Sequence, residues 1–369
     1  MIYLDNGATS FPKPFPVRQA VARALTHWAN PGRGGYPAAM AAAKGAYRCR
    51  ELAAAMFDCQ PEQVTFVSNC THGLNIAIRS LVRPGSKVLI SGFEHNAVTR
   101  PLHGLGVERI VAGRTLFDRE DTLSRFEDGL KQRPEAAVFT HVSNVFGYIL
   151  PVEEMAALCR QYGVPFILDA AQSAGSLDVS LKKLGAAYIA MPGHKGLLGP
   201  QGTGLLLCGE LPQPLIRGGT GSDSILQDMP EYLPDRLEAG TVNVPGIAGL
   251  EAGMKYLRQV GIRNIARREH HQAARCAAGL KELGMKVFSG RDQAGTVSFL
   301  PGMDCQDAAE RLGRMGFAVR AGLHCAPLAH ESAGTLESGT VRVSFGHDAR
   351  DAHCDRLLEA VSKLPAYVM

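Results

Sequence analysis

Residues 165–208 read PFILDAAQSAGSLDVSLKKLGAAYIAMPGHKGLLGPQGTGLLLC and contain three apolar runs separated by more polar stretches. We expect strands at Pro165–Leu168, Tyr188–Ala190 and Thr203–Leu207, with a short helix at Leu181–Leu184 before the second strand. Alternation of strands and helices requires crossover connections, which produce a mostly parallel sheet covered by helices on both faces. In such sheets, ligands bind beyond the carboxyl ends of the strands.

The same alternation extends back to about residue 60. Further strands are expected at Val64–Val67, Lys87–Ile90, Arg109–Ala112 and Ala136–Val142, and further helices at Leu74–Val82 and Val152–Tyr162. The sequence therefore predicts an α/β fold, with a large domain at residues 15–250 that contains a mostly parallel seven-stranded sheet. Within it, the Gly/Pro-rich residues Leu211–Pro234 are expected to form a long loop.

After about residue 250 the order of the predicted elements becomes mixed, which is typical of a smaller α+β domain. The expected helices are Ile247–Val260, Ile262–Leu283, Asp304–Met315 and Asp351–Leu364, and the expected strands are Lys286–Ser289, Gly295–Phe299, Phe317–Arg320 and Val341–Phe345. We assign residues 1–14 and 251–369 together to this smaller domain.

The composition excludes several classes of protein. Hydrophobic residues are 46% of the chain and charged residues 20%, which excludes a mostly disordered protein. No apolar run reaches the roughly 18 residues of a membrane span, and the net charge of +4 includes no basic stripe for nucleic acid. The N-terminus MIYLDNGATSFPKP lacks the plan of an export signal, so we expect a cytoplasmic protein. The chain has nine cysteines, and no two of them form a C-x-x-C pair. Except for Cys325, they are expected to be buried thiols.

Four polar motifs follow predicted strands directly. Lys195 lies in the glycine-rich MPGHKG, where a desolvated amine could form a Schiff base, although a surface-loop lysine is the alternative. Asp169 ends an apolar strand and could pair with a cation such as a pyridinium nitrogen, or cap a helix. SNCTHGLN at 68–75 opens a helix whose free amides suit a phosphate, although many helices begin with threonine. His95 could lie over a flat ring, although a lone histidine more often makes a plain polar contact.

Together these motifs resemble the fold-type I pyridoxal phosphate-dependent enzymes of aminotransferase class V. They are most similar to the family of cysteine desulfurases and selenocysteine lyases. The resemblance runs from YLDNGAT at residues 3–9 to VRVS at residues 341–344. Its most specific parts are LDAAQS at 168–173, GHKG at 193–196 and RAGLHCA at 320–326, and the last of these resembles the SufS-like group, whose catalytic loop is short and ordered.

The resemblance implies which residues hold pyridoxal 5'-phosphate. Lys195 would hold the cofactor covalently, Asp169 would face the pyridine nitrogen and Gln172 the ring hydroxyl. His95 would stack on the ring and shuttle protons. The phosphate would be bound by Thr71, the amide of His72, and His194, and by Thr241 of the neighbouring subunit, so that the site implies a homodimer.

The resemblance also implies the reaction, in which L-cysteine is converted to L-alanine. Asn144, Arg342 and Arg33 would bind the substrate, with the planar guanidinium of Arg342 suited to the substrate carboxylate. The freed amine of Lys195 would take the α-proton. Cys325 would attack the substrate sulfur as a thiolate, which the nearby groups His324 or Arg320 could favour, and then pass the persulfide sulfur to an acceptor protein or thiol.

The chain departs from SufS-like enzymes at three positions. Pro192 stands where they often have a serine that contacts the phosphate, and Gly32 and Tyr36 stand where they have histidines. Selenocysteine lyase and cysteine-sulfinate desulfinase therefore stay open, because their substrates differ from cysteine only at the β-substituent. A class V aminotransferase or another β-lyase is a further enzymatic alternative, and a catalytically inactive sulfur-transfer scaffold is the non-enzymatic one.

Overall fold

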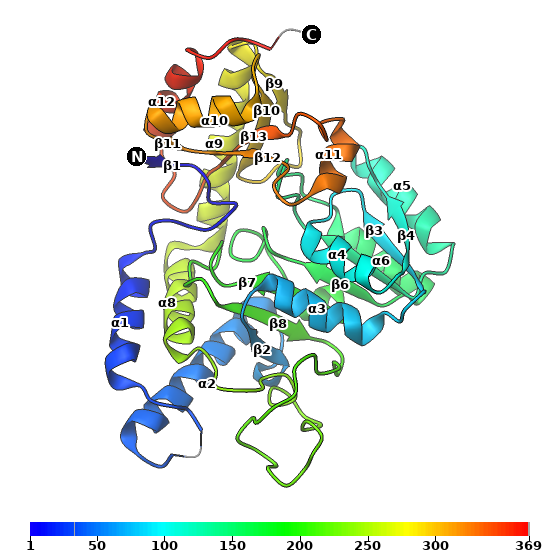
Figure 1. Cartoon of the computed structure of the whole chain (residues 1–369), viewed down its shortest axis with the longest axis vertical. Coiled ribbons are helices and arrows are strands. Elements are labelled where there is room, and N and C mark those ends of the chain that lie inside the picture. The colour runs from blue at the N-terminus through cyan, green and yellow to red at the C-terminus, as the bar shows by residue number, and fades with distance from the viewer. Residues whose placement is uncertain (33, 368–369) are drawn as a thin grey trace.

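The sheet predicted from the strand–helix alternation forms the centre of the molecule in the computed structural model, which describes residues 1–32 and 34–367 (Figure 1). The order of its strands is β2 (Val64–Val67), β8 (Gly204–Cys208), β7 (Tyr188–Pro192), β6 (Phe166–Asp169), β5 (Ala136–Thr140), β3 (Lys87–Ser91) and β4 (Glu108–Ala112). The strands from β7 to β4 run parallel to one another, and β8 runs antiparallel to both of its neighbours. The seven-stranded, mostly parallel sheet is therefore confirmed.

Helices cover both faces of this sheet because successive side chains of its strands point to opposite sides. Leu89 and Phe139 pack in one core with α2 (Pro37–Phe57), α5 (Arg119–Leu130), α6 (Val152–Tyr162), α7 (Leu181–Leu184) and α8 (Val244–Val260). Val88, Ile90 and Val138 pack in another core with α3 (Cys70–Leu81) and α4 (Asn96–Gly104). Each of these fully buried side chains stabilises the fold by about 1.5–3 kcal/mol.

A third core is formed by the two ends of the chain. An antiparallel sheet has the order β12 (Arg320–Gly322), β13 (Thr340–Ser344), β10 (Thr296–Leu300) and β9 (Lys286–Phe288). It packs with α9 (Ile262–Glu282), α10 (Cys305–Arg314) and α12 (Asp351–Val361). Strand β1 (Ile2–Tyr3) pairs in parallel with β11 (Phe317–Ala318), and Ile2 and Leu4 are buried in this core. The domain limits at residues 14 and 250 stay a prediction.

Some details of the fold differ from the sequence expectations. The single strand expected at Phe317–Arg320 is two strands, because β11 pairs with β1 while β12 pairs with β13 in another sheet. Helices α1 (Phe15–His27), α2, α4 and α5 were not predicted from the sequence. Helices α1 and α2 pack against α8, beside the sheet (Figure 1).

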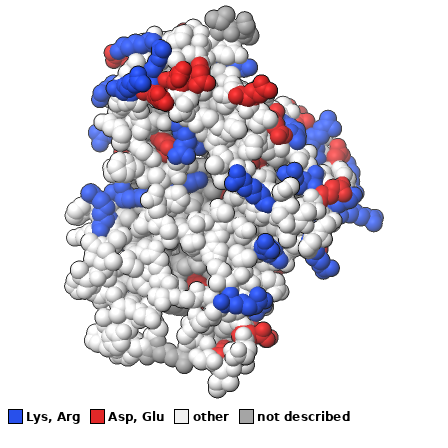
Figure 2. Space-filling model, viewed as in Figure 1, with Lys and Arg blue, Asp and Glu red and all other residues white. Residues whose placement is uncertain are grey.

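The surface agrees with the mixed charge pattern of the sequence. On the face shown in Figure 2, the Lys and Arg side chains lie in separate groups with Asp and Glu among them, rather than in a continuous stripe. No helix within residues 1–32 and 34–367 is both long and apolar enough to cross a membrane. As expected, Leu211–Pro234 contains no helix or strand.

Candidate active site

The carboxyl end of β6 places a buried acid at the expected edge of the sheet. Asp169 is the last residue of β6 and is 2% exposed. Its Oδ1 atom accepts a hydrogen bond from the backbone N–H of Ala171 at 2.9 Å and from the thiol of Cys70 at 3.4 Å. A buried carboxylate in this position favours a cation as its neighbour.

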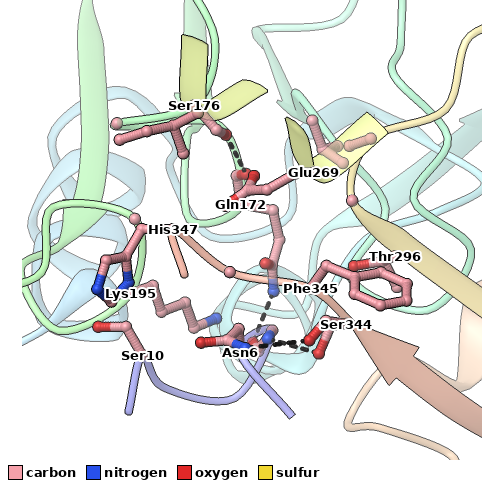
Figure 3. A pocket seen from close by; sticks show the side chains of 18 of the residues that line it. Asn6, Ser10, Gln172, Ser176, Lys195, Glu269, Thr296, Ser344, Phe345 and His347 are labelled. Atoms are coloured by element: carbon pink, nitrogen blue, oxygen red, sulfur yellow. Dashed lines mark hydrogen bonds between the residues drawn. The ribbon is translucent and has the colours of Figure 1, made fainter. Parts of the chain in front are cut away.

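Lys195 lies in the loop that follows β7 and lines a cavity of about 60 Å³ together with Gln172 (Figure 3). Burial lowers the pKa of its ammonium, while the charge of Asp169 acts in the opposite direction. A lysine amine with a lowered pKa is the form that attacks a carbonyl group. The side chain of Gln172 is held by the backbone, because its Nε2 donates to the carbonyl oxygen of Gly7 at 2.9 Å.

His95 is the N-cap of α4 and its protonation is defined by one hydrogen bond. Its Nδ1 accepts from the backbone N–H of Ala97 at 2.9 Å, so in the neutral ring the proton lies on Nε2. Burial lowers the pKa of His95, while Asp169 opposes this change. The neutral ring is therefore fixed in orientation and can donate a hydrogen bond from Nε2.

The start of α3 is only partly free to bind a phosphate. Thr71 is exposed in the first turn, but the amide of His72 already donates to the capping side chain of Asn69 at 2.9 Å. His72 and Thr241 line one cavity of about 230 Å³. His194 instead contacts the N-terminal segment, where its Nδ1 lies 3.0 Å from Thr9 Oγ1.

The loop between β12 and α11 (Pro327–Ala333) exposes Cys325, whereas the other eight cysteines are buried or half-buried. His324 and Cys325 have φ angles of 48° and 56°, in the left-handed region that costs non-glycine residues conformational energy. Two contacts hold the loop in place. Asn144 Nδ2 donates to the carbonyl oxygen of His324 at 2.7 Å. The backbone N–H of Asn96 donates to the carbonyl oxygen of Cys325, also at 2.7 Å.

The expectation that His324 supplies a positive charge to the thiol is wrong. His324 is buried, and burial together with the charge of Arg342 lowers the pKa of its imidazole to about 2. Its Nε2 lies 3.2 Å from the carbonyl oxygen of Thr340, so the ring acts as a neutral group that fixes the loop. Arg320, whose side chain is half exposed, is therefore the cationic candidate of the two.

Arg342 is buried on β13 and is already held by the protein. Its two terminal nitrogens donate to the carbonyl oxygen of Asn144 at 3.0 Å and to Asp5 Oδ1 at 2.7 Å, while its buried Nε has no partner within the described residues. Asp5 also pairs with Arg320 at 3.1 Å. Asp5 was not predicted from the sequence as a site residue, although it lies in the YLDNGAT motif.

The three divergent positions lie in different places. Pro192 is the last residue of β7, Tyr36 is the N-cap of α2, and Gly32 lines a hollow of about 560 Å³ with Thr241. Arg33 lies outside the described residues. Lys195 and Asp169 lie near enough for their charges to act on each other, and both act on His95. Of the expected phosphate ligands, His72 and Thr241 line one cavity, while His194 contacts the N-terminal segment.

The site fits a cofactor of a definite chemical kind. An amine with a lowered pKa suits an aldehyde, a buried carboxylate suits a protonated ring nitrogen, and an oriented imidazole suits a flat ring. The unpartnered Nε of Arg342 could still donate one hydrogen bond to an anion. The fold and the site therefore define an α/β protein built for an aromatic aldehyde cofactor.

Comparisons with known proteins identify the family. The aminotransferase class-V model matches residues 2–357, and the chain belongs to this pyridoxal phosphate-dependent family. It is 33% identical to a probable cysteine desulfurase of Methanothermobacter thermautotrophicus, over 93% of this chain and 90% of the relative. It is also 33% identical to one of Pyrococcus abyssi, over 94% and 89%. The apo structure of the cysteine desulfurase from Thermococcus onnurineus covers 98% of this chain, which in turn covers 94% of that structure, with a TM-score of 0.90 and 31% identity.

Proposed function

We propose that this protein is a pyridoxal phosphate-dependent cysteine desulfurase. It converts L-cysteine to L-alanine, carries the sulfur as a persulfide on Cys325 and passes it to an acceptor protein or thiol. The observation that carries the proposal is the placement of Cys325. Cys325 is exposed. Its backbone carbonyl oxygen accepts a hydrogen bond from the backbone N–H of Asn96, the residue next to His95. A reactive cysteine is thereby held beside a site suited to an amino acid.

The residue roles follow from the atoms that are available. When bound, pyridoxal phosphate supplies an electron sink for carbanion chemistry at the substrate Cα. Lys195 would hold the cofactor, and its free amine would take the α-proton of the substrate. Asp169 would face the ring nitrogen and Gln172 the ring hydroxyl. His95, with a proton on Nε2, would lie against the ring.

The phosphate and carboxylate ends of the site are assigned in the same way. Thr71, the amide of His72, His194 and the Thr241 of a second subunit would bind the phosphate, and the amide of His72 would then have to share or release its bond to Asn69. The substrate carboxylate is bound by Arg342, with Asn144 and Arg33 as further contacts. Each terminal nitrogen of Arg342 has two N–H groups and donates one hydrogen bond within the protein. The substrate carboxylate could therefore use a remaining N–H, including that of the unpartnered Nε.

The sulfur transfer balances without an added oxidant. The Cys325 thiolate attacks the substrate sulfur, an S–S bond forms, and the C–S bond breaks with its electron pair left on the substrate carbon. That carbon is protonated and leaves as alanine, while Cys325 becomes a persulfide. We assign the half-exposed Arg320 as the cationic group of this loop, whereas the neutral His324 carries no charge.

Three wider assignments belong to the proposal. The protein acts as a homodimer, since Thr241 is assigned to the neighbouring site. Residues 15–250 form the large domain, and residues 1–14 with 251–369 form the smaller one. The location is cytoplasmic, in keeping with a catalytic step that needs Cys325 as a free thiol.

The test compares alanine release from L-cysteine with dithiothreitol by the native protein and by Cys325→Ala. Cys59→Ala, at a half-buried cysteine, is the matched control. We expect alanine from the native and control proteins and almost none from Cys325→Ala. Equal release by all three would refute persulfide chemistry and favour a selenocysteine lyase or cysteine-sulfinate desulfinase, which can work without the thiol. No bound cofactor and no release would favour an inactive scaffold.

A further inference from the structure

Glu94 is a buried acid beside the site that the proposed reaction does not use. It lies between the end of β3 and His95, and none of its surface is exposed. Its Oε1 atom accepts hydrogen bonds from the hydroxyl of Ser91 and from the backbone N–H of Thr140, the latter at 2.9 Å. Thr140 ends β5 and is the register partner of Asp169. Glu94 thus joins the end of β3 to the end of β5. It precedes His95 in the chain, and the residue that it contacts on β5 is paired with Asp169.

The surroundings of Glu94 do not support a negative charge. Its Oε2 atom is buried without a hydrogen-bond partner, and no ion pair of Glu94 occurs among the described residues. The charged group that acts on it is another acid, Asp169, which approaches from the end of β6. Burial is the largest effect and raises the pKa of Glu94 to about 8. A buried carboxyl without a cation is stable only when it carries its proton.

We propose that Glu94 is a positioning residue that acts as a neutral carboxylic acid, fixing the turn that carries His95 to the strand end beside Asp169. The role in catalysis rests on the proposed function. Glu94 accepts a hydrogen bond from Thr140, the register partner of Asp169, so the two acids belong to neighbouring strand ends. Keeping one of them neutral removes the repulsion between two negative charges. Glu94 is the acid that keeps its proton, because its Oε2 is buried without a hydrogen-bond partner among the described residues. Glu94 would then fix the turn at His95 without adding a second negative charge beside Asp169.

Two substitutions separate this role from an ionised one. Glu94→Gln keeps the accepting oxygen for Ser91 and Thr140 and cannot ionise, so the clamp should survive. Glu94→Ala leaves those donors buried without a partner. Glu337→Gln makes the same chemical change at an exposed glutamate and is the control. We expect the cofactor dissociation constant of Glu94→Gln to stay near the native value and that of Glu94→Ala to rise about tenfold or more.

The decisive measurement is thermal unfolding of the cofactor-loaded protein and its variants between pH 6 and pH 9.5. The native fold binds the Glu94 proton up to about pH 8, while the unfolded chain loses it near the ordinary glutamate value, so native stability falls as pH rises through this window. Glu94→Gln lacks this loss. Its Tm relative to the native protein should therefore rise with pH, whereas that of Glu337→Gln should not.

The proposal is overturned if the Tm difference between Glu94→Gln and the native protein is the same at pH 6 and pH 9.5. Loss of cofactor by Glu94→Gln as large as that by Glu94→Ala would also overturn it. If Glu94→Ala does not fold, the pH series of Glu94→Gln still decides. Failure of the proposed desulfurase activity would appear separately, as native protein that releases no alanine.

Discussion

Replacing Arg50 by methionine should destabilise the protein strongly, because Arg50 is half of a buried ion pair. The side chains of Arg50 and Glu238 are 10% and 9% exposed, and the guanidinium lies 4.2 Å from the centre of the Phe66 ring. Glu238 Oε1 also accepts from the backbone N–H of Phe66 at 2.6 Å. Removing the cation leaves a buried carboxylate, which typically costs about 3–5 kcal/mol.

The double substitution Arg50→Met with Glu238→Gln should recover much of this loss, because no uncompensated charge stays buried. Urea unfolding followed by circular dichroism gives the change in free energy. Fluorescence of Trp28, the single tryptophan, reports the same region, since its ring packs at Gly45 of α2, the helix that carries Arg50.

The pH dependence gives a second reading of the same effect. Burial raises the pKa of Glu238 while Arg50 lowers it, so without Arg50 the carboxyl group holds its proton to higher pH. The penalty of Arg50→Met should therefore be largest near pH 8 and shrink toward pH 5. A loss below about 1 kcal/mol, which is the value of an exposed pair, or an equal loss at both pH values, would refute the reasoning.

Three further predictions concern the loop of Lys195 and its neighbours. Lys13 Nζ donates to the carbonyl oxygen of His194 at 2.7 Å, and burial lowers its pKa to about 8. As the pH rises from 8 to 10, the native protein should therefore become more stable relative to Lys13→Met. A difference in Tm between the two proteins that does not change over this range would contradict the prediction. Asp169→Asn should weaken binding of added pyridoxal phosphate, measured by its absorbance, by at least about tenfold, the effect of one lost charge-assisted contact. Gly175→Ala should lower the free energy of unfolding in urea by about 1–3 kcal/mol. Gly175 has a φ of +90°, and a Cβ there would lie 2.4 Å from the carbonyl oxygen of Gly196. An unchanged urea midpoint would show that the loop adjusts to the added methyl group without cost.

The sequence predicted the strands well because buried parallel strands are short, apolar and bounded by polar loops. The polar residues at their ends, Asp169 and His95, could therefore be placed at one edge of the sheet from the sequence alone. Helix α2 was harder, because its alanine-rich sequence gives a weak apolar pattern. Its place depends on packing against α8, which no local pattern shows.

Contacts between distant segments could not be predicted from local patterns. Asp5 pairs with Arg342 and Arg320, which are over 300 residues away in the chain. Burial could not be predicted from local patterns either. His324 and Cys325 are neighbours in the same loop, but His324 is buried and Cys325 is exposed. The cation expected at His324 was therefore wrong for a reason that only tertiary packing supplies. Glu94 was overlooked because its neighbour His95 carried the motif.

The contact between the two ends of the chain also sets the order in which the protein can become functional during synthesis. Arg342 is synthesised 337 positions after Asp5. The pair can therefore form only after all of the residues between them have been made. Contacts of such large sequence separation form slowly. Lys195 and Cys325 both precede Arg342 in the sequence, so the two reactive groups are made before the arginine of the pocket that directs them.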